Sequence, residues 1–428
     1  MRRERPEAEG GASCARLTAR IARLRSHRPE LCNLEETARC SRITRLSAQG
    51  CSPAKNSGLP TLRAGRLFEI VQDGMYFGIG ISQTDWEAAT VAQKWRCRPE
   101  GSNWGEFGPD DQLGRLNYLT EENTLKAAQE IKVGKRFCLS LPLDVPRTNA
   151  TNARRHPPEF KSLVRNGEVN FNLPLGRGNP GETAVNSDDA VIIYNQHSTQ
   201  WDAFAHKGSM FDANGDGEPE PVHYNGHSIC DENGKPRFGE VGAWHLGIEH
   251  MARACVQDRG VLLNLKKHYG EQSHPVSFDD LMYILDSDGI QVERADILCV
   301  YTGYADLLLA LGETVPEDLP RTRCSALDGR DEKLLRWIDD TGIAALASDN
   351  RAVEYEHGGL PQGVTSGAQL PIHELCLFKL GIHLGEMFYL SELAEWLSTN
   401  NRYRFFLSAP PLHLPGAVGS PANPIGTV

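Results

Sequence analysis

Short apolar runs separated by helical segments are the feature that most constrains the fold of this 428-residue chain. Residues 260–265, 295–301 and 343–347 each have the length and the apolar composition of a buried strand. A helical pattern over residues 331–338 lies between the last two runs, and polar residues follow the strand ends. This alternation predicts an α/β or α+β fold, with a site built from loops at the ends of strands.

Other segments extend the pattern towards both ends of the chain. Residues 136–141 and 403–407 are predicted as strands, and residues 375–380 as a helix. The apolar run 190–194 is predicted as a further buried strand. Residues 147–183 are polar and contain Pro and Gly, which predicts a long loop of the kind that forms lids or binding loops or is disordered.

The first part of the chain differs in composition from the rest. Residues 1–66 are rich in Arg, Ser and Gly with little apolar periodicity, which predicts a poorly ordered extension. Residues 67–94 are interpreted as a linker or edge segment, and residues 95–428 as a single catalytic domain. The arginines of the extension resemble a mitochondrial transit peptide, but transit peptides are poor in acids and this extension contains several glutamates. We expect a cytoplasmic protein and leave mitochondrial targeting open.

The overall composition argues against two classes of partner. A formal net charge of −11 is unlike that of a nucleic-acid-binding protein, which presents a basic face. No apolar run has the length that crosses a bilayer, so no membrane partner is expected. The 11 cysteines are odd in number and include no C-x-x-C pair, which is typical of reduced thiols inside a cell. Apolar neighbours predict that four of them are buried: Cys138, Cys255, Cys299 and Cys376.

Acidic and imidazole side chains follow the apolar run 190–194. Asp202 and His206 lie four residues apart, shortly after His197. Carboxylate and imidazole groups are what a metal site or an acid–base pair requires. The alternative is an ordinary loop with a solvated Asp and a hydrogen-bonded His, because short motifs of this kind also occur by chance.

A second acid and imidazole pair occurs late in the chain. His373 and Glu386 flank the largely apolar segment 374–385, which as a helix or hairpin returns both residues to one place. Together with Asp202 they form a ligand set that zinc or manganese accepts. The alternatives are a packed or capping histidine and a surface carboxylate.

One acidic loop imitates the beginning of a calcium-binding loop. Residues 212–217 have the expected spacing of Asp, Asn and Gly, but the twelfth position is His223 instead of the bidentate Glu. We therefore interpret this segment as a turn-rich loop.

In combination, these segments resemble the cyclase family that includes bacterial kynurenine formamidases and isatin hydrolases. The likeness extends from about residue 104 to the C-terminus. Four segments carry it in the same order: 104–117, 196–206, 302–304 with 348–354, and 373–386 with 408–421. The resemblance implies a swivelling β/β/α fold and hydrolysis of a carbon–nitrogen bond, often in a formamide or a lactam. It also implies that a divalent metal activates water, that Asp202, His373 and Glu386 hold the metal, and that His206 is the acid/base.

The chain departs from the family pattern at the early metal ligands. Gln196 and Gln200 stand where the family has histidines, and an amide oxygen is a weaker, neutral ligand for zinc. We therefore expect at most a single-metal site of Asp202, His373 and Glu386. Trp201 replaces a smaller residue and is expected to wall the substrate pocket. Three residues are expected to orient the substrate carbonyl: Gln200, Tyr301 and Asn350.

The leading hypothesis is therefore a hydrolase, similar to an arylformamidase, that acts on an amide, formamide or lactam of a small aromatic or secondary-metabolite substrate. One alternative is a metal-free cyclase or dehydratase, in which Asp202 and His206 form a simple proton-transfer pair. Another is a non-catalytic protein that binds small molecules, because a fold does not dictate a function. Members of the family are often dimers or larger, so a homo-oligomer is expected.

Overall fold

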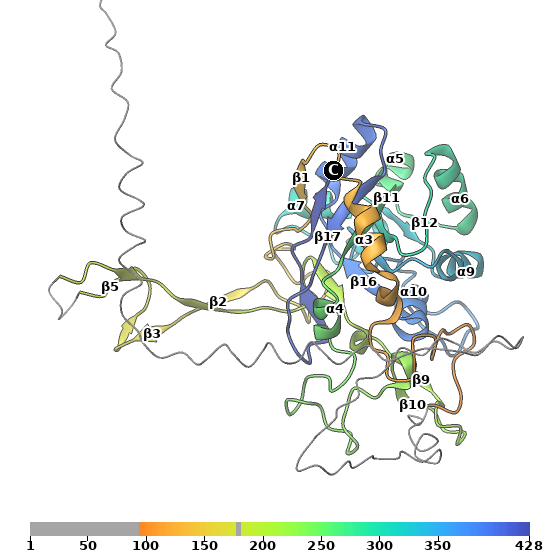
Figure 1. The fold of residues 1–428 in the computed structure, drawn as a ribbon, viewed down its shortest axis with the longest axis horizontal. Helices are drawn as coiled ribbons and strands as arrows, with labels where there is room; N and C mark the ends of the chain where they lie inside the picture. Colours follow the sequence, from red (N-terminus) through yellow and green to blue (C-terminus); the bar gives the residue numbers. More distant parts are fainter. Residues whose placement is uncertain (1–93, 177–180) are drawn as a thin grey trace, which may run out of the picture. The chain divides into compact units, whose positions relative to one another are not determined.

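The structure is a computed structural model that describes residues 94–176 and 181–428. Within these residues, the main sheet contains nine strands in the order β1-β19-β17-β11-β13-β15-β16-β8-β18 (Figure 1). Strands β11, β13, β15 and β16 are parallel to one another, and the remaining pairs are antiparallel. The bounds of the nine strands are β1 Arg136–Cys138, β8 Gln200–Asp202, β11 Gln257–Asn264, β13 Ile297–Tyr301, β15 Ala345–Ser348, β16 His383–Glu386, β17 Arg404–Ser408, β18 Gly419–Pro421 and β19 Ile425–Thr427.

The predicted apolar strands form the centre of this sheet. The runs 260–265, 295–301 and 343–347 correspond to β11, β13 and β15, and every residue of β13 and β15 is buried. The helix predicted over residues 331–338 corresponds to α9 (Glu332–Thr341). The mixed α/β class predicted from the sequence is therefore confirmed.

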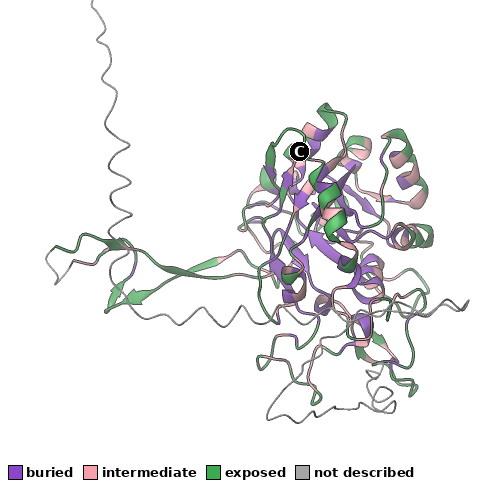
Figure 2. Cartoon of the chain, viewed as in Figure 1, coloured by how far each residue is buried: buried purple, intermediate pink, exposed green. Residues whose placement is uncertain are grey.

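Helices cover both faces of the sheet, which explains why its central strands are apolar on both sides. On one face, α6 (Phe278–Ser287) and α9 bury apolar side chains in one core cluster with alternate residues of β11, β13 and β15. On the opposite face, α4 (Glu249–Arg253) and α11 (Ser391–Thr399) pack against the intervening residues in a second cluster. Figure 2 shows the buried sheet between partly exposed helices.

The remaining elements connect these layers or extend from them. The other helical elements are η1 Gly114–Tyr118, α3 Glu121–Ala128, η2 Phe204–His206, η3 Tyr224–Gly226, α5 Leu265–Tyr269, α7 Tyr304–Leu311, α8 Leu319–Thr322, α10 Pro371–His373 and the π-helical η4 Glu374–Leu380. Short two-stranded pairs are formed by β9 Ser209–Phe211 with β10 Glu220–Val222, and by β12 His274–Val276 with β14 Ser325–Leu327. None of the helices in the described residues is long and apolar enough to cross a membrane.

The structure corrects the prediction for the run 190–194 and for the loop 147–183. The run does not form a buried strand, because β7 (Asp189–Ile192) is exposed and lies outside the main sheet. It pairs with β2 (Glu159–Ser162), inside the segment that was predicted to be a loop. The same segment contains β3 Val164–Arg165, β4 Glu168–Val169 and β5 Leu173–Pro174, and β5 pairs with β6 Val185–Asn186. Apolar composition predicted a strand correctly, but it did not specify what the strand packs against.

The prediction of four buried cysteines is half correct, and the predictions for residues 1–94 fall almost entirely outside the described residues. Cys299 and Cys376 are buried as predicted, whereas Cys138 and Cys255 are exposed, because they lie at a sheet edge and in a turn. The proposed extension, residues 1–66, and nearly all of the proposed linker, residues 67–94, lie outside the described residues.

Candidate metal centre

Two neighbouring antiparallel strands bring the early motif to the late one. Glu386 on β16 is opposite Gln200 on β8, and Leu384 is opposite Asp202. Because side chains alternate between the faces of a strand, Gln200 and Asp202 share a face with Glu386, and Trp201 lies on the other. The register of one strand pair thus places two carboxylates and an amide side by side.

His373 completes this group from α10, which directly precedes η4. Its Nε2 atom is 3.3 Å from Oε1 of Glu386. One potential ligand atom from each of Asp202, His373 and Glu386 lies within 4.8 Å of the others, and all three side chains are buried. The segment between His373 and Glu386 returns along η4 and β16, as the sequence suggested.

Two oxygen atoms at this centre lack a hydrogen-bond partner among the described residues. The Gln200 amide donates from Nε2 to Oδ1 of Asp202 at 3.2 Å and to Oε2 of Glu386 at 3.0 Å. Within the described part of the chain, Oδ2 of Asp202 and Oε1 of Gln200 are buried without a hydrogen bond. Burial raises the pKa of Asp202, as expected for a carboxylate removed from water. Buried oxygens of this kind are costly unless a cation or a donor satisfies them, so the donor set fits a divalent metal.

Sequence reasoning missed one residue of the centre, Glu354. Its Oε1 accepts hydrogen bonds from Nδ1 and from the backbone N–H of His373, each at 2.9 Å, and its Oε2 accepts from the N–H of Ile372 at 2.9 Å. A carboxylate behind a histidine is the arrangement that orients metal-binding imidazoles. Glu354 ends the segment 348–354 that carried part of the resemblance, but nothing local distinguishes it from a surface acid.

The carboxylates of Glu354 and Glu386, on either side of His373, favour the protonated form of its imidazole. Burial alone would lower the pKa of His373, but its hydrogen bonds to Glu354 and Glu386 raise the pKa to about 10. A site that binds a proton so tightly on a buried imidazole has an excess of negative charge. This excess is what a divalent cation would compensate.

His206 lies at the opening of the centre to a cleft. Its Nε2 atom is 3.9 Å from Oδ2 of Asp202, and its side chain is 22% exposed. The cleft has a volume of about 690 Å³ and is also lined by His373, Glu386, Arg155 and Lys207. His206 is therefore placed between the buried carboxylates and the space that a substrate can enter.

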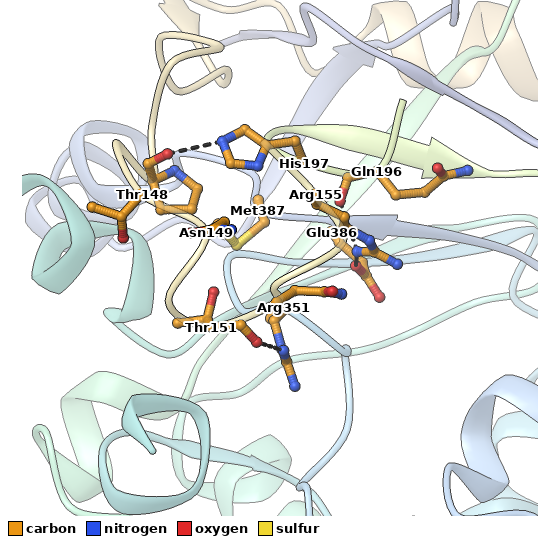
Figure 3. A pocket seen from close by; sticks show the side chains of 11 residues that line it. Thr148, Asn149, Thr151, Arg155, Gln196, His197, Arg351, Glu386 and Met387 are labelled. Carbon is orange, nitrogen blue, oxygen red and sulfur yellow. Dashed lines mark hydrogen bonds and ion pairs between the residues drawn. The ribbon is translucent and has the colours of Figure 1, made fainter. Parts of the chain in front are cut away.

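Basic side chains line the cleft, and two of them, Arg155 and Arg351, also line the small neighbouring cavity drawn in Figure 3. Arg155 donates from Nη1 to the carbonyl oxygen of Gln196 at 2.7 Å, and the same nitrogen is 4.0 Å from Oε2 of Glu386. Arg351 is held by Glu356 and by the backbone oxygen of Thr151. Arg155 is thus the cation that faces the metal centre, whereas the charge of Arg351 is already paired.

The remaining predicted residues lie elsewhere. Trp201 is fully buried and donates from Nε1 to the carbonyl of Ala409 at 2.8 Å, since strand alternation turns it away from the cleft. Tyr301 hydrogen-bonds to Asp306 at 2.6 Å, and neither Tyr301 nor Asn350 lines a cleft described above. The predicted roles of Tyr301 and Asn350 in orienting a substrate stay predictions.

Two further residues of the early motif also have defined positions. His197 approaches the carbonyl oxygen of Pro146 at 2.8 Å, beside the small cavity of Figure 3. Gln196 lines the cleft, and its Nε2 atom is buried without a partner among the described residues. The acidic loop at Asp212 uses this side chain to accept backbone N–H groups of residues 215–217, which is the predicted turn.

Comparisons with known proteins identify the family and the fold of the chain. The model of the putative cyclase family matches residues 137–355, half of the chain. A crystal structure described as a novel cyclase is 29% identical, with 76% of this chain and 99% of that chain covered and a TM-score of 0.60. Its likeness confirms the predicted cyclase-like fold.

Two more distant solved structures are also similar. Isatin hydrolase A from Labrenzia aggregata, bound to benzyl benzoate, is 11% identical, with 72% of this chain and 99% of that chain covered and a TM-score of 0.43. A structure described as a potential metal-dependent hydrolase with cyclase activity is 13% identical, with 68% and 98% covered and a TM-score of 0.37. No curated protein sequence matches this chain.

Proposed function

Because this chain belongs to the putative cyclase family, we propose that it hydrolyses a carbon–nitrogen bond in an amide, formamide or lactam. The observation that carries the proposal is the convergence of Asp202, His373 and Glu386 within 4.8 Å beneath an open cleft. A cleft of about 690 Å³ is in the range of small-molecule sites, so the substrate is small.

Three side chains supply the ligand atoms for zinc or manganese: Asp202, His373 and Glu386. Two carboxylates and one imidazole would suit either ion, and the same three side chains lie beside the cleft. A divalent metal at this place supplies Lewis acidity, which lowers the pKa of water and polarises a carbonyl group. Glu354 accepts a hydrogen bond from Nδ1–H of His373, and this orientation would leave Nε2 as the nitrogen that binds a metal.

Gln200 has a positioning role in this proposal. Its amide nitrogen bridges Asp202 and Glu386, and this bridge offsets the repulsion between two carboxylates that are buried side by side. Arg155, 4.0 Å from Glu386, adds a compensating charge from the cleft side. A neutral glutamine at this position therefore keeps the pair of carboxylates in place.

His206 is the proposed acid/base. It accepts a proton from the attacking water and delivers it to the departing nitrogen, so that amide and water become a carboxylic acid and an amine. Its partial exposure lets it reach a substrate, and Asp202 at 3.9 Å stabilises the protonated imidazole during the transfer.

The test combines metal analysis with a substrate panel. The full-length protein is purified without chelator and analysed for bound metals, and its hydrolysis of aryl formamides, lactams and simple amides is measured before and after chelation. We expect about one zinc or manganese ion per chain and activity that is lost on chelation and restored by the metal.

Two results would contradict the proposal. Turnover without bound metal and without sensitivity to chelator would favour the metal-free cyclase or dehydratase. Ligand binding without turnover of any member of the panel would favour the binding protein.

A further inference from the structure

The cleft beside the metal centre is lined by more cations than carboxylates, although the chain as a whole is acidic. Four cationic side chains line this cleft: Arg154, Arg155, Lys207 and Arg351. The carboxylates among the lining residues are those of Glu356 and Glu386. The formal net charge of the whole chain is −11. A cleft whose charge is opposite in sign to that of the protein concentrates anions locally.

Two of the four cations have an anionic partner. Arg351 donates to Oε1 of Glu356 from Nε at 2.9 Å and from Nη2 at 2.6 Å. Arg155 lies 4.0 Å from Oε2 of Glu386 and also donates to the carbonyl oxygen of Gln196. These two pairs use both of the carboxylates that line the cleft.

The other two cations, Lys207 and Arg154, have no such partner. In the part of the chain that the structure describes, neither the ammonium group nor the guanidinium group forms a hydrogen bond or an ion pair. Arg154 is exposed, whereas Lys207 is half-buried. A half-buried ammonium group has lost part of its hydration without gaining a counter-ion, which is unfavourable. An anionic ligand in the cleft would supply this counter-ion.

Ordered backbone positions both cations. Lys207 is extended and lies between η2 and β9, directly after His206, the proposed acid/base. Arg154 lies in a turn, where its backbone N–H donates to Oδ1 of Asn152 at 3.2 Å and the N–H of Arg155 donates to the carbonyl of Asn152 at 3.0 Å. The two charges therefore come from two separate segments that both reach the cleft.

The cleft also offers apolar surface. Tyr194, Leu370 and Val418 line it together with the cations. Aromatic and aliphatic side chains are what the body of a small substrate packs against, while a few polar groups fix its orientation. The lining thus suits a molecule that has an apolar body and a negative charge.

We propose that the substrate carries a carboxylate in addition to the bond that is cleaved, and that Lys207 and Arg154 bind this carboxylate. This inference rests on the proposed function, because it narrows the class of amide, formamide or lactam that is hydrolysed. A carboxylate accepts charge-assisted hydrogen bonds from both ammonium and guanidinium groups. Since Lys207 follows His206 directly, the bound carboxylate lies near the reacting bond, as in an aryl carboxylate with the formamide on the same ring.

The first test measures binding without any hydrolysis. Benzoate and its neutral counterpart, benzyl alcohol, contain no bond that the enzyme would cleave, and their Kd values are measured by ligand-observed NMR on the full-length metal-loaded protein. We expect benzoate to bind at least ~10-fold more tightly. Lys207→Gln should raise the Kd of benzoate roughly 10–30-fold, the range expected for loss of a hydrogen bond to a charged group.

Two further variants complete the binding test. The matched control is Lys132→Gln, which removes the same charge from an exposed lysine outside the cleft and should leave the Kd of benzoate unchanged. Arg154→Gln alters an exposed side chain and should raise this Kd by a smaller factor, about 3–10-fold. Arg154→Gln carries the test if Lys207→Gln does not fold.

The second test measures substrate preference. The kcat/KM for 3-formamidobenzoate should exceed that for 3-formamidobenzyl alcohol at least ~10-fold, and Lys207→Gln should reduce this ratio mainly by raising KM for the anionic substrate. Equal kcat/KM values for the two compounds would overturn the proposal and leave the proposed hydrolysis standing. Selective binding of benzoate without turnover of either compound would support the carboxylate site and count against the hydrolysis.

Two results of the binding test would also overturn the proposal. One is a Kd of benzoate that neither Lys207→Gln nor Arg154→Gln changes. The other is binding of benzoate that is lost on chelation but survives in Lys207→Gln, because the carboxylate would then bind the metal instead of the two cations.

Discussion

Two polar clusters lie at the carboxyl ends of the parallel strands, and they differ in how completely their polar atoms are paired. Glu386 and Tyr301 are the last residues of the parallel strands β16 and β13. At Tyr301, Asp306 accepts hydrogen bonds from the tyrosine hydroxyl at 2.6 Å, from Nζ of Lys266 at 2.7 Å and from the hydroxyl of Ser391. This cluster contains one carboxylate and one ammonium group, so its charges balance.

The cluster at Glu386 is unbalanced. It contains three carboxylates, those of Asp202, Glu354 and Glu386, around the imidazole of His373. Two further basic groups approach from the cleft, His206 at 3.9 Å from Asp202 and Arg155 at 4.0 Å from Glu386. Oδ2 of Asp202 accepts no hydrogen bond from the described residues. The comparison shows that a position at the end of a strand does not distinguish a site from a structural cluster. Buried oxygens without a hydrogen bond and an excess of negative charge distinguish the candidate site from the structural cluster.

The largest effect is expected from Asp202→Asn. The amide keeps the shape of the side chain but removes a charged ligand, so metal content should fall from about one ion per chain to nearly none, and activity at least ~100-fold. Elemental analysis and the formamide assay measure both. The thermal midpoint in chelator should not fall, because burial raises the pKa of Asp202 and the amide removes a buried charge. A variant that retains full metal content would disprove the assignment of this ligand.

Glu354→Gln should have a smaller effect at the same centre. The Glu354 carboxylate contacts His373 and not the open space of the cleft. Because it only orients the imidazole, we expect the affinity for the metal to fall roughly 10–100-fold. Competition with a chelator measures the affinity, and excess metal should restore activity. Unchanged affinity would mean that Glu354 does not orient the imidazole.

Tyr301→Phe examines the balanced cluster. Loss of the hydroxyl removes hydrogen bonds to Asp306 and Ser391, and we expect the free energy of unfolding to fall by about 1–2 kcal/mol. Metal content and kcat/KM should stay within about twofold of wild type. Chemical denaturation and the substrate assay separate the outcomes, and a selective rise in KM would support the substrate role that the sequence suggested.

The smallest effect is expected from Asp258→Asn, which is the matched control for Asp202→Asn. Oδ2 of Asp258 is also buried and unpaired among the described residues, but no cluster of potential ligands surrounds it there. Metal content should therefore not change. A fall in metal content would contradict this expectation, because it would mean that a buried oxygen without neighbouring ligands also affects metal binding.

The same variant should change the pH dependence of stability. Burial raises the pKa of Asp258 from 3.8 to about 6, so the folded state binds this proton more tightly than the unfolded state. Its stabilising contribution is complete below about pH 4 and is lost as the pH rises to about 6. Between pH 4 and pH 7 the variant should gain about 1 kcal/mol relative to wild type, once solvent screening is allowed for. Urea unfolding at both pH values measures this gain, and a difference independent of pH would contradict it.

Strands and helices of the body could be predicted from local patterns, because burial between two helical layers requires continuous apolar runs such as β13. The run 190–194 has a similar composition but forms an exposed strand, since composition does not reveal which surface covers a strand. Glu354 was missed for a comparable reason. A glutamate that accepts three N–H groups from α10 has no local signal that separates it from a solvated one.

By itself, the sequence determined the α/β class and the family, and it named three candidate ligands, because strand periodicity and the spacing of polar residues are local properties. Only the tertiary structure decided that Asp202, His373 and Glu386 meet, that Trp201 faces the core, and that Tyr301 joins a separate cluster. The physical reason is strand register: a single pairing of β8 with β16 sets which side chains share a face, and that pairing joins segments almost two hundred positions apart.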